Sequence, residues 1–375
     1  MEDCSASYSS MRERDGEMVR IPALVLHQFI VDILRSYGMS SGDASVAADA
    51  LVDADLLGLD THGVAHLANH PSYVPGIESG LVNAKPNITV KDLGPVLAMV
   101  DGDDGMGLVA VNIALTHAME RCMETGVGIA WVRRSYHAGA LAVFARRAAL
   151  EGFLTLALTS TRPSVAPTYG LTAALGTNPI SVGVPYQPSR VLLLDMATSA
   201  VAAGKIERAR RNNQSVPTGW IIDKEGNDST SPNDYFQGGS LLPLGSFPVH
   251  SSHKGYGLAV MVDVATGIIS GMGHSLILPT HGHAHMVACV DISRVMPRNE
   301  FLGAVQQMVD DLHMLPAVSG YRVWVPGERE WNSYEDNVAN GIPVAKPVFE
   351  ELGQLAVRRG LDKSWSMIQQ YWHED

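Results

Sequence analysis

The chain has 375 residues, 46% hydrophobic and 18% charged, which is the composition of a globular protein with a sizeable core. Its formal net charge of −12 argues against nucleic acid as the main partner, because an acidic surface repels phosphate backbones. Three cysteines without a Cys-x-x-Cys pair argue against a disulfide framework or a cysteine-rich zinc site and favour a reducing compartment.

The N-terminus gives no sign of export. Residues 1–20 are polar, mixed in charge and without an apolar signal core, so they are predicted to form a disordered leader. The longest apolar stretch, residues 257–273, contains Asp263 and several glycines and is too short to cross a bilayer. We therefore expect a cytoplasmic protein that does not enter membranes.

Apolar residues at helical spacing predict two helices in the first part of the chain, over 22–38 and 41–58. Asp43 is a candidate N-cap of the second helix and Gly58 its expected stop. The stretch GLDTHGVAHL, residues 58–67, follows this helix end and is expected to lead into another helix. Residues 71–95 contain Pro and Gly and are predicted to form a connection.

From residue 96 onward strands and helices alternate, which is typical of an α/β protein. The predicted strands are 95–102, 127–132, 153–161, 177–186, 191–199 and 286–293. The predicted helices are 106–126, the second part of 135–152, a buried helix over 253–271, an amphipathic helix over 298–315 and a helix near 345–360. Residues 323–331 are predicted to form a loop.

The usual nucleotide and nucleophile motifs are absent from the sequence. It contains no G-x-G-x-x-G fingerprint, no complete phosphate-binding loop and no G-x-S-x-G elbow. Histidine chemistry therefore becomes the main lead.

Two groups of histidines could hold a metal. His62 and His66 would share one helical face, but a zinc protease needs Glu where this chain has Gly63. His281, His283 and His285 alternate and could chelate a metal from one face of a strand, although a polar turn between strands is the favoured interpretation.

His137 lies between a predicted strand and a predicted helix, where catalytic groups often sit. A neutral histidine with an aspartate on its second nitrogen can give and take a proton near neutral pH. Asp195 ends an apolar strand and could be that aspartate, or it could cap the following segment as an ordinary N-cap. Alone, His62 and His137 could each be an ordinary surface or capping histidine.

Eight motifs, taken together and in this order along the chain, resemble those of a known family, although each motif alone is weak evidence. They are GLDTHGVAHL, SYHAGA, LGTNPISVGVP, LDMATSAVAAGKI, VPTGWIIDKEGNDST, LLPLG, HKGYGLAVMVDV and VPGERE. Over about residues 22–360 the chain resembles the type-2 malate/L-lactate dehydrogenase family, which includes ureidoglycolate dehydrogenase, diketogulonate reductase and piperideine-2-carboxylate reductase.

The resemblance implies an NAD(P)-dependent oxidoreductase. Such an enzyme transfers hydride between nicotinamide and a 2-oxo or 2-hydroxy acid, a related ketone or a cyclic imine, with a histidine as proton donor or acceptor. It implies an α/β fold whose nicotinamide-binding domain, over 96–315, is not a Rossmann fold and has a mixed, largely antiparallel sheet. A helical substrate and dimerisation domain is implied from both chain ends, 21–95 with 316–375, in a homodimer that takes a small-molecule substrate.

Site residues follow by matching motifs. The family's reacting histidines match His62 and His137, either of which could be the proton donor or acceptor, and Asp195 is the third catalytic candidate because it could orient one of them. Thr61 and His66 match the family's substrate-binding positions. The positions implied to bind the cofactor are Ser160, Thr161, Gly176, Thr177, Asn178, Asp195, Met196, Ala197, Lys254, Pro326, Gly327 and Glu328. No metal is implied.

The chain departs from the family pattern D-S-H-G-V-x-R-L at two positions. Thr61 replaces the serine and keeps a hydroxyl, whereas His66 replaces an arginine that would clamp a substrate carboxylate. Ser160 also stands where the family has asparagine. These changes point to a substrate without a free carboxylate, or to a cyclic imine.

The choice between NAD and NADP stays open, because none of the arginines that could meet a 2′-phosphate lies in a deciding motif. These arginines are Arg133, Arg134, Arg162 and Arg329. Two other functions also stay open: a metal-dependent hydrolase or lyase that uses the histidine clusters, and an inactive NAD(P)-binding relative.

Overall fold

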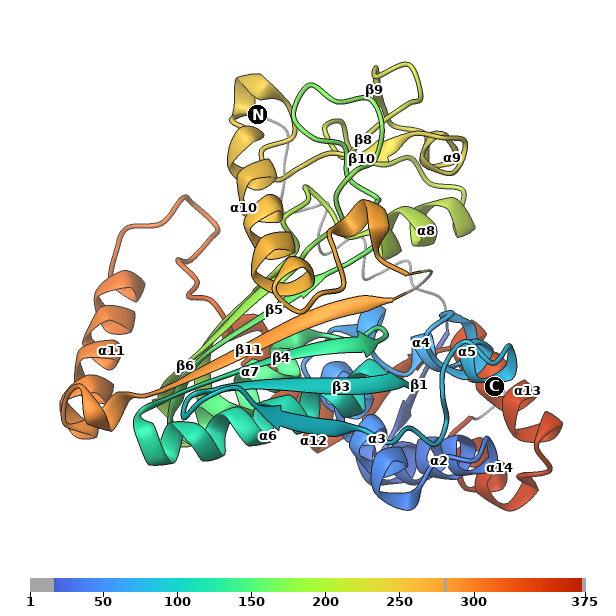
Figure 1. The fold of residues 1–375 in the computed structure, drawn as a ribbon. Coiled ribbons are helices and arrows are strands. Elements are labelled where there is room, and N and C mark those ends of the chain that lie inside the picture. Colours follow the sequence, from blue (N-terminus) through green and yellow to red (C-terminus); the bar gives the residue numbers. More distant parts are fainter. Residues whose placement is uncertain (1–16, 280–281, 373–375) are drawn as a thin grey trace. The chain divides into compact units, whose positions relative to one another are not determined.

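The computed structural model describes residues 17–279 and 282–372 (Figure 1). The chain divides into two compact units: one joins the residues up to Gly80 with those from Arg329 onward, and the other runs from Leu81 to Glu328. The expected boundaries were 95 and 316. The difference arises because residues 89–92 pair with the large sheet of the second unit, as does the loop before Glu328.

The first unit is mostly helical and is built from both chain ends. Its helices are α2 (Ala23–Ser36), α3 (Ser41–Leu56), α4 (Ala65–Asn69), α5 (Val74–Glu78), α12 (Glu328–Asn340, from Arg329 onward), α13 (Lys346–Arg358) and α14 (Asp362–Gln369). A 3₁₀ turn, Asp60–His62, lies between α3 and α4. The two ends are joined by β1 (Met18–Ile21), which pairs antiparallel with β12 (Ile342–Ala345).

Three expectations for this unit are corrected. Residues 18–20 lie in β1 and not in a disordered leader, because the chain pairs there with β12; residues 1–16 lie outside the described residues. The N-cap of α3 is Ser40 and not Asp43, since Ser40 Oγ accepts the Asp43 N–H at 3.1 Å. The predicted loop 323–331 turns into helix α12 at Glu328.

The second unit contains a seven-stranded sheet in the order β2-β3-β4-β11-β5-β6-β7. Only β3 and β4 are parallel, so the prediction of a mixed, largely antiparallel sheet is confirmed. The strands are β2 (Thr89–Asp92), β3 (Leu97–Gly105), β4 (Val127–Ser135), β5 (Phe153–Ser160), β6 (Ile180–Gln187), β7 (Arg190–Met196) and β11 (His283–Asp291).

Helices cover both faces of this sheet (Figure 1). Leu158 and Met286 pack with Val262 of α10 (His253–Asp263) on one face. On the other face Gly183 lies so close to α7 (Leu141–Leu150) that a Cβ there would overlap the Ala145 carbonyl oxygen. Two further helices complete the α/β alternation, α6 (Gly107–Thr125) and α11 (Arg298–His313).

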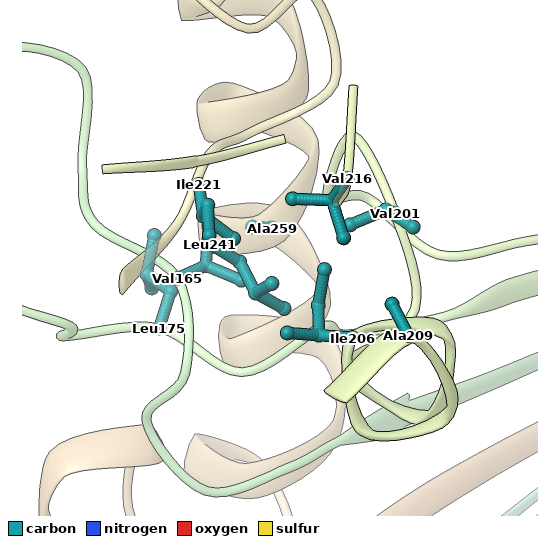
Figure 2. Packing of buried hydrophobic residues seen from close by; sticks show 9 residues of the cluster. All are labelled: Val165, Leu175, Val201, Ile206, Ala209, Val216, Ile221, Leu241 and Ala259. Carbon is teal, nitrogen blue, oxygen red and sulfur yellow. The ribbon is translucent and has the colours of Figure 1, made fainter. Parts of the chain in front are cut away.

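A smaller three-stranded sheet, ordered β10-β8-β9, completes the second unit. Its elements are β8 (Ile221–Ile222), β9 (Asp228–Ser229) and β10 (Ser240–Leu241), with helices α8 (Ala203–Arg211) and α9 (Pro232–Phe236). Figure 2 shows nine buried apolar side chains between β8, β10, α8 and α10, with Leu241 and Ala259 among them. This cluster fixes α10 against the small sheet.

The segment 253–271 is less buried and less regular than predicted. The α-helix ends at Asp263 and continues as a π-helical turn, Val264–Ile268. Leu258, Met261 and Ile268 are 40%, 60% and 50% exposed, because one side of this segment faces away from both sheets. The helices of the described residues include none with the length and hydrophobicity of a membrane span.

Candidate active site

Most of the predicted site residues of the second unit gather at one edge of the large sheet. The pairing register puts the end of β4 beside the start of β11, and the start of β11 beside the end of β5. The start of β6 and the end of β7 continue the same edge. The residues at or directly beyond this edge are His137, Ser160, Thr161, Gly176, Thr177, Asn178, Asp195, Met196, Ala197 and His283.

His137 lies in the loop between β4 and α7. The Gly139 N–H donates to His137 Nδ1 at 3.1 Å, so a neutral ring carries its hydrogen on Nε2. The preceding peptide lies directly against the first turn of α6, where a Cβ at Gly107 would overlap the Tyr136 carbonyl oxygen. The local backbone therefore fixes both the position and the tautomer of His137.

The favoured interpretation of His283 and His285 as a polar turn is wrong. Both lie in β11, 7% and 0% exposed, because an apolar strand continues through them into the sheet; His281 lies outside the described residues. His285 Nε2 is 3.1 Å from the Tyr136 oxygen and Nδ1 is 2.8 Å from Thr159 Oγ1. With both nitrogens engaged, His285 is not available as a metal ligand.

Within residues 17–279 and 282–372, no group of three His, Cys, Asp or Glu side chains could hold a metal ion. The rings of His137 and His283 are edge-on, with centroids 5.6 Å apart. Their proximity adds a second imidazole to the surroundings of His137.

The Gly-Thr-Asn segment forms a tight corner with the end of β5. The Thr161 N–H donates to Asn178 Oδ1 at 3.0 Å, and the Thr177 N–H donates to Thr161 Oγ1 at 3.0 Å. A Cβ at Gly176 would overlap the Thr161 hydroxyl, so glycine is required there. Backbone groups and threonine hydroxyls therefore remain as the polar groups that this corner can offer a ligand.

Asn178 is held inward by a residue that sequence reasoning missed. Its amide Nδ2 donates to Asp263 Oδ1 at 3.0 Å, and the same carboxylate accepts from Ser275 Oγ at 2.8 Å and from the Ser275 N–H at 3.0 Å. Asn178 and Asp263 are 0% and 2% exposed. The one signal for this role was an acidic residue inside an apolar helical stretch.

Asp195 is exposed near the end of β7, where it pairs with Ser181 of β6. Three strands lie between β7 and β4, and a hydrogen bond from a histidine N–H to the Asp195 carboxylate stays a prediction. Beyond Asp195, Thr198 Oγ1 donates to the Thr177 carbonyl oxygen at 3.0 Å and ties the Asp-Met-Ala segment to the Gly-Thr-Asn corner.

The two remaining regions predicted to bind the cofactor, Lys254 and the loop 326–328, are not among the residues at this end of the large sheet. Lys254 is exposed in the first turn of α10. The Pro326 carbonyl accepts the Leu193 N–H at 3.2 Å, and Gly327 has a φ of 94° where β7 leaves no room for a Cβ. The loop 326–328 therefore lies along the edge strand β7.

Glu328 holds this loop together and is 6% exposed. Its carboxylate accepts the Val325 N–H at 3.1 Å and pairs with Arg322 at 2.7 Å and with His313 at 3.1 Å. These contacts occupy both carboxylate oxygens, so the side chain has a structural part to play in the loop.

In the first unit, His62 begins a series of neighbouring histidine rings that are tilted against one another. Thr61 Oγ1 is 2.9 Å from His62 Nδ1, and ring centroids are separated by 5.5 Å from His62 to His66 and by 4.8 Å from His66 to His70. Burial lowers the pKa of His62 to about 4. Burial, with His62 and His70 nearby, holds the pKa of His66 well below its usual range, so His66 is neutral at neutral pH.

Asp55 of α3, also missed by sequence reasoning, lies beneath this histidine turn. Its Oδ2 accepts the Val64 N–H at 2.8 Å, and Gly63 lies so close that a Cβ would overlap the carboxyl group. Asn337 Nδ2 donates to the Asp55 carbonyl at 3.0 Å. Burial raises the pKa of the Asp55 carboxyl to about 8.

The fold and these motifs match those of known dehydrogenases. A family model described as malate/L-lactate dehydrogenase matches residues 21–353. Malate dehydrogenase of Pyrococcus horikoshii is 39% identical over 355 residues, 93% of this chain and 98% of that protein. Its solved structure has a TM-score of 0.83 at 38% identity, covering 92% of this chain and 97% of that chain.

Two more distant relatives cover nearly the same length. Ureidoglycolate dehydrogenase (NAD(+)) of Escherichia coli K12 is 28% identical over 89% of this chain and 95% of that protein. The structure of Δ1-piperideine-2-carboxylate reductase from Pseudomonas syringae has a TM-score of 0.79 at 27% identity, covering 90% and 99%.

These matches define the chain first as a dehydrogenase by fold and by sequence. It belongs to the malate/L-lactate dehydrogenase family, as the ordered motifs predicted. The prediction of an oxidoreductase is confirmed by this membership.

Proposed function

We propose that this chain transfers hydride between NAD(H) or NADP(H) and a 2-oxo or 2-hydroxy acid, a related ketone or a cyclic imine. The main support is that His137 lies at the same end of the large sheet as the corner formed by Thr161 and the Gly-Thr-Asn segment. The Gly139 N–H also fixes the tautomer of His137. Side chains cannot carry a hydride, so a bound nicotinamide would supply it. The named substrates of the relatives, two acids and a cyclic imine, fit this range.

The chain's own part is proton transfer and orientation. In reduction, a His137 ring protonated on both nitrogens would give its Nε2 proton to the oxygen or nitrogen of the reduced group and be left neutral; in oxidation the neutral ring, with Nε2 unprotonated, would take that proton back. Since Nδ1 accepts from the Gly139 N–H, this exchange requires that hydrogen bond to open so that Nδ1 can carry the other hydrogen. His62, whose Nδ1 contacts Thr61, is the second candidate for this role. Asp195 is proposed to orient one of the two imidazoles.

The residues present fit a nicotinamide nucleotide. Ser160 Oγ is buried and has no hydrogen-bond partner among the described residues, so it offers a polar contact to a bound group. Met196 and Ala197 are proposed to line the nicotinamide beside it. Lys254 would meet a pyrophosphate as a point charge, and Pro326 and Gly327 would flank the nucleotide.

Two of the four arginines considered for a 2′-phosphate are already paired with acids. Arg133 contacts Asp101 at 3.1 Å, and Arg134 contacts Asp103 and Asp104 at 2.9 and 3.1 Å. Arg162 is therefore a stronger candidate than these two for recognising NADP. Titrating the protein with both nucleotides decides between NAD and NADP.

Fluorescence titration with NADH and NADPH tests the proposed function. At least one of the two should bind below millimolar concentration, and a panel of 2-oxo acids and cyclic imines should reveal turnover. Binding without turnover on the panel would favour an inactive relative. Stoichiometric metal in the purified protein, without nucleotide binding, would favour the hydrolase or lyase.

His66 is proposed to set substrate specificity. A bidentate arginine–carboxylate pair is charge-assisted, and such bonds are worth roughly 1.5–3 kcal/mol. Because His66 is neutral at neutral pH, we expect small 2-oxo acids to bind about ten- to a hundredfold more weakly than they would to an arginine.

His66→Arg should therefore raise activity on pyruvate-like acids and lower activity on the native substrate. Steady-state kinetics of wild type and His66→Arg on the same acids measure this change. The idea would be abandoned if wild type already used small 2-oxo acids well at pH 8 and the arginine variant gained nothing.

We also propose that the chain acts as a homodimer. Leu258, Met261, Val264 and Ile268 form an apolar stripe, 40–60% exposed, along α10 and its π-helical turn. Met261→Asp should shift the mass measured by light scattering toward a monomer. Leu24→Asp, on an 85% exposed residue of α2, is the matched control and should leave the mass unchanged.

A further inference from the structure

One buried histidine of the large sheet has no part in the proposed reaction. His285 lies on β11, the middle strand of the seven, and is 0% exposed. A buried polar ring is costly unless its nitrogens find partners. Both nitrogens of His285 have one: the Tyr136 carbonyl oxygen at 3.1 Å and Thr159 Oγ1 at 2.8 Å.

These two partners fix the protonation of the His285 ring. The Tyr136 carbonyl can only accept, so His285 Nε2 carries the hydrogen and donates it. Nδ1 is then the acceptor, and the Thr159 hydroxyl donates to it. Burial lowers the pKa of His285 to about 4, so the ring remains neutral at neutral pH.

The carbonyl that His285 holds belongs to the residue directly before His137. On another side the same carbonyl lies against Gly107, where no Cβ fits. The Gly139 N–H then holds His137 Nδ1. The peptide before His137 is therefore fixed by a glycine contact and a buried hydrogen bond, and its ring by a backbone amide.

We propose that His285 is a positioning residue for His137 and acts through the Tyr136 carbonyl. The inference rests on the proposed function, in which His137 exchanges a proton with the substrate. A neutral ring holds the loop without adding a charge beside His137. Loss of this contact should therefore lower kcat, and the midpoint of the pH–rate profile should not change.

Two amide substitutions separate the two hydrogen bonds of His285. The amide of His285→Gln reaches the position of Nε2 and can still donate to Tyr136, whereas the amide of His285→Asn stops near Nδ1 and serves only Thr159. A displacement of about 1 Å can cost on the order of 10²-fold, so we expect kcat to fall about 10- to 100-fold in His285→Asn. His285→Gln should keep most of the rate.

The readouts exclude a general loss of stability. Nucleotide affinity, KM and the midpoint of the pH–rate profile should be the same in wild type and both variants. Cys289→Ala is the matched control, since Cys289 is buried on the same strand, 3.8 Å from Thr155 and away from the site edge. Its kcat should equal that of wild type.

A double mutant completes the test. In a His137→Ala background, His285→Asn should lower kcat no further, because the effect passes through His137. An equal loss in both backgrounds, or equal rates in the Gln and Asn variants, overturns the positioning role. Wild-type turnover in His137→Ala alone would instead overturn the assignment of His137 in the proposed function.

Discussion

Replacement of His137 by alanine is expected to lower turnover by about 10²–10⁴-fold, the usual contribution of a positioned acid–base group. The structural reason is that the Gly139 amide leaves Nε2 as the nitrogen that carries the exchangeable proton. Affinity for reduced nicotinamide should barely change. Single-turnover kinetics of the hydride step, together with a fluorescence titration, measure the two quantities separately.

His62→Ala is the necessary companion, since His62 is the other candidate for the acid–base role. Burial lowers the pKa of His62 to about 4, so its ring is neutral at neutral pH. We expect the smaller loss in the rate of the chemical step here, because the local backbone fixes the tautomer of His137. If neither substitution slows the chemical step, both histidines are wrongly assigned.

Protein stability is expected to decrease between about pH 4 and pH 8 because of Asp55. Burial raises its pKa from 3.8 to about 8, so the folded chain holds a proton there that the unfolded chain has lost. The contribution of this group is thus fully present below about pH 4 and is lost as the pH rises through about 8. A pKa shift of this size corresponds to a decrease in the free energy of unfolding on the order of several kcal/mol over this pH range.

Asp55→Asn is expected to remove this part of the pH dependence. The amide oxygen can still accept the Val64 N–H, and the side chain stays neutral at every pH. In denaturant unfolding at pH 5 and pH 9, the free energy of unfolding of the variant relative to that of wild type should be higher at pH 9 than at pH 5. Asp43→Asn is the matched control, since Asp43 lies in the first turn of the same helix and is only partly buried. Parallel pH curves for wild type and Asp55→Asn would contradict the prediction.

How far the sequence predicts this site depends on whether the signal is local. His137 follows a strand and precedes a helix, and its motif indicated both the loop and the candidate role. For Asp263 the one signal was an acidic residue inside an apolar helical stretch, and Asp55 gave none, because an acidic residue inside a helix looks the same in the sequence whether it faces solvent or a turn from elsewhere in the chain. Their partners, Val64 and Asn178, are known only from the folded chain.

The interpretation of His283 and His285 failed for a related reason. Alternating histidines are polar and follow Pro and Gly, so local composition favoured a turn. The fold instead places His285 between β4 and β5, where Tyr136 and Thr159 satisfy both ring nitrogens. A buried polar strand is stable only when such partners exist, and no local pattern reveals them.

The sequence by itself determined the family and the α/β alternation, since these depend on ordered motifs and on the spacing of apolar residues. It also gave the candidate residues for proton exchange, which stay predictions. Only the tertiary structure decided the strand order, because β11 enters the middle of the sheet long after its neighbours β4 and β5. It also decided which polar groups are used internally, among them Glu328, Asn178 and His285. The physical reason is that hydrogen bonds and burial depend on distances between segments far apart in the chain, which spacing along the sequence does not contain.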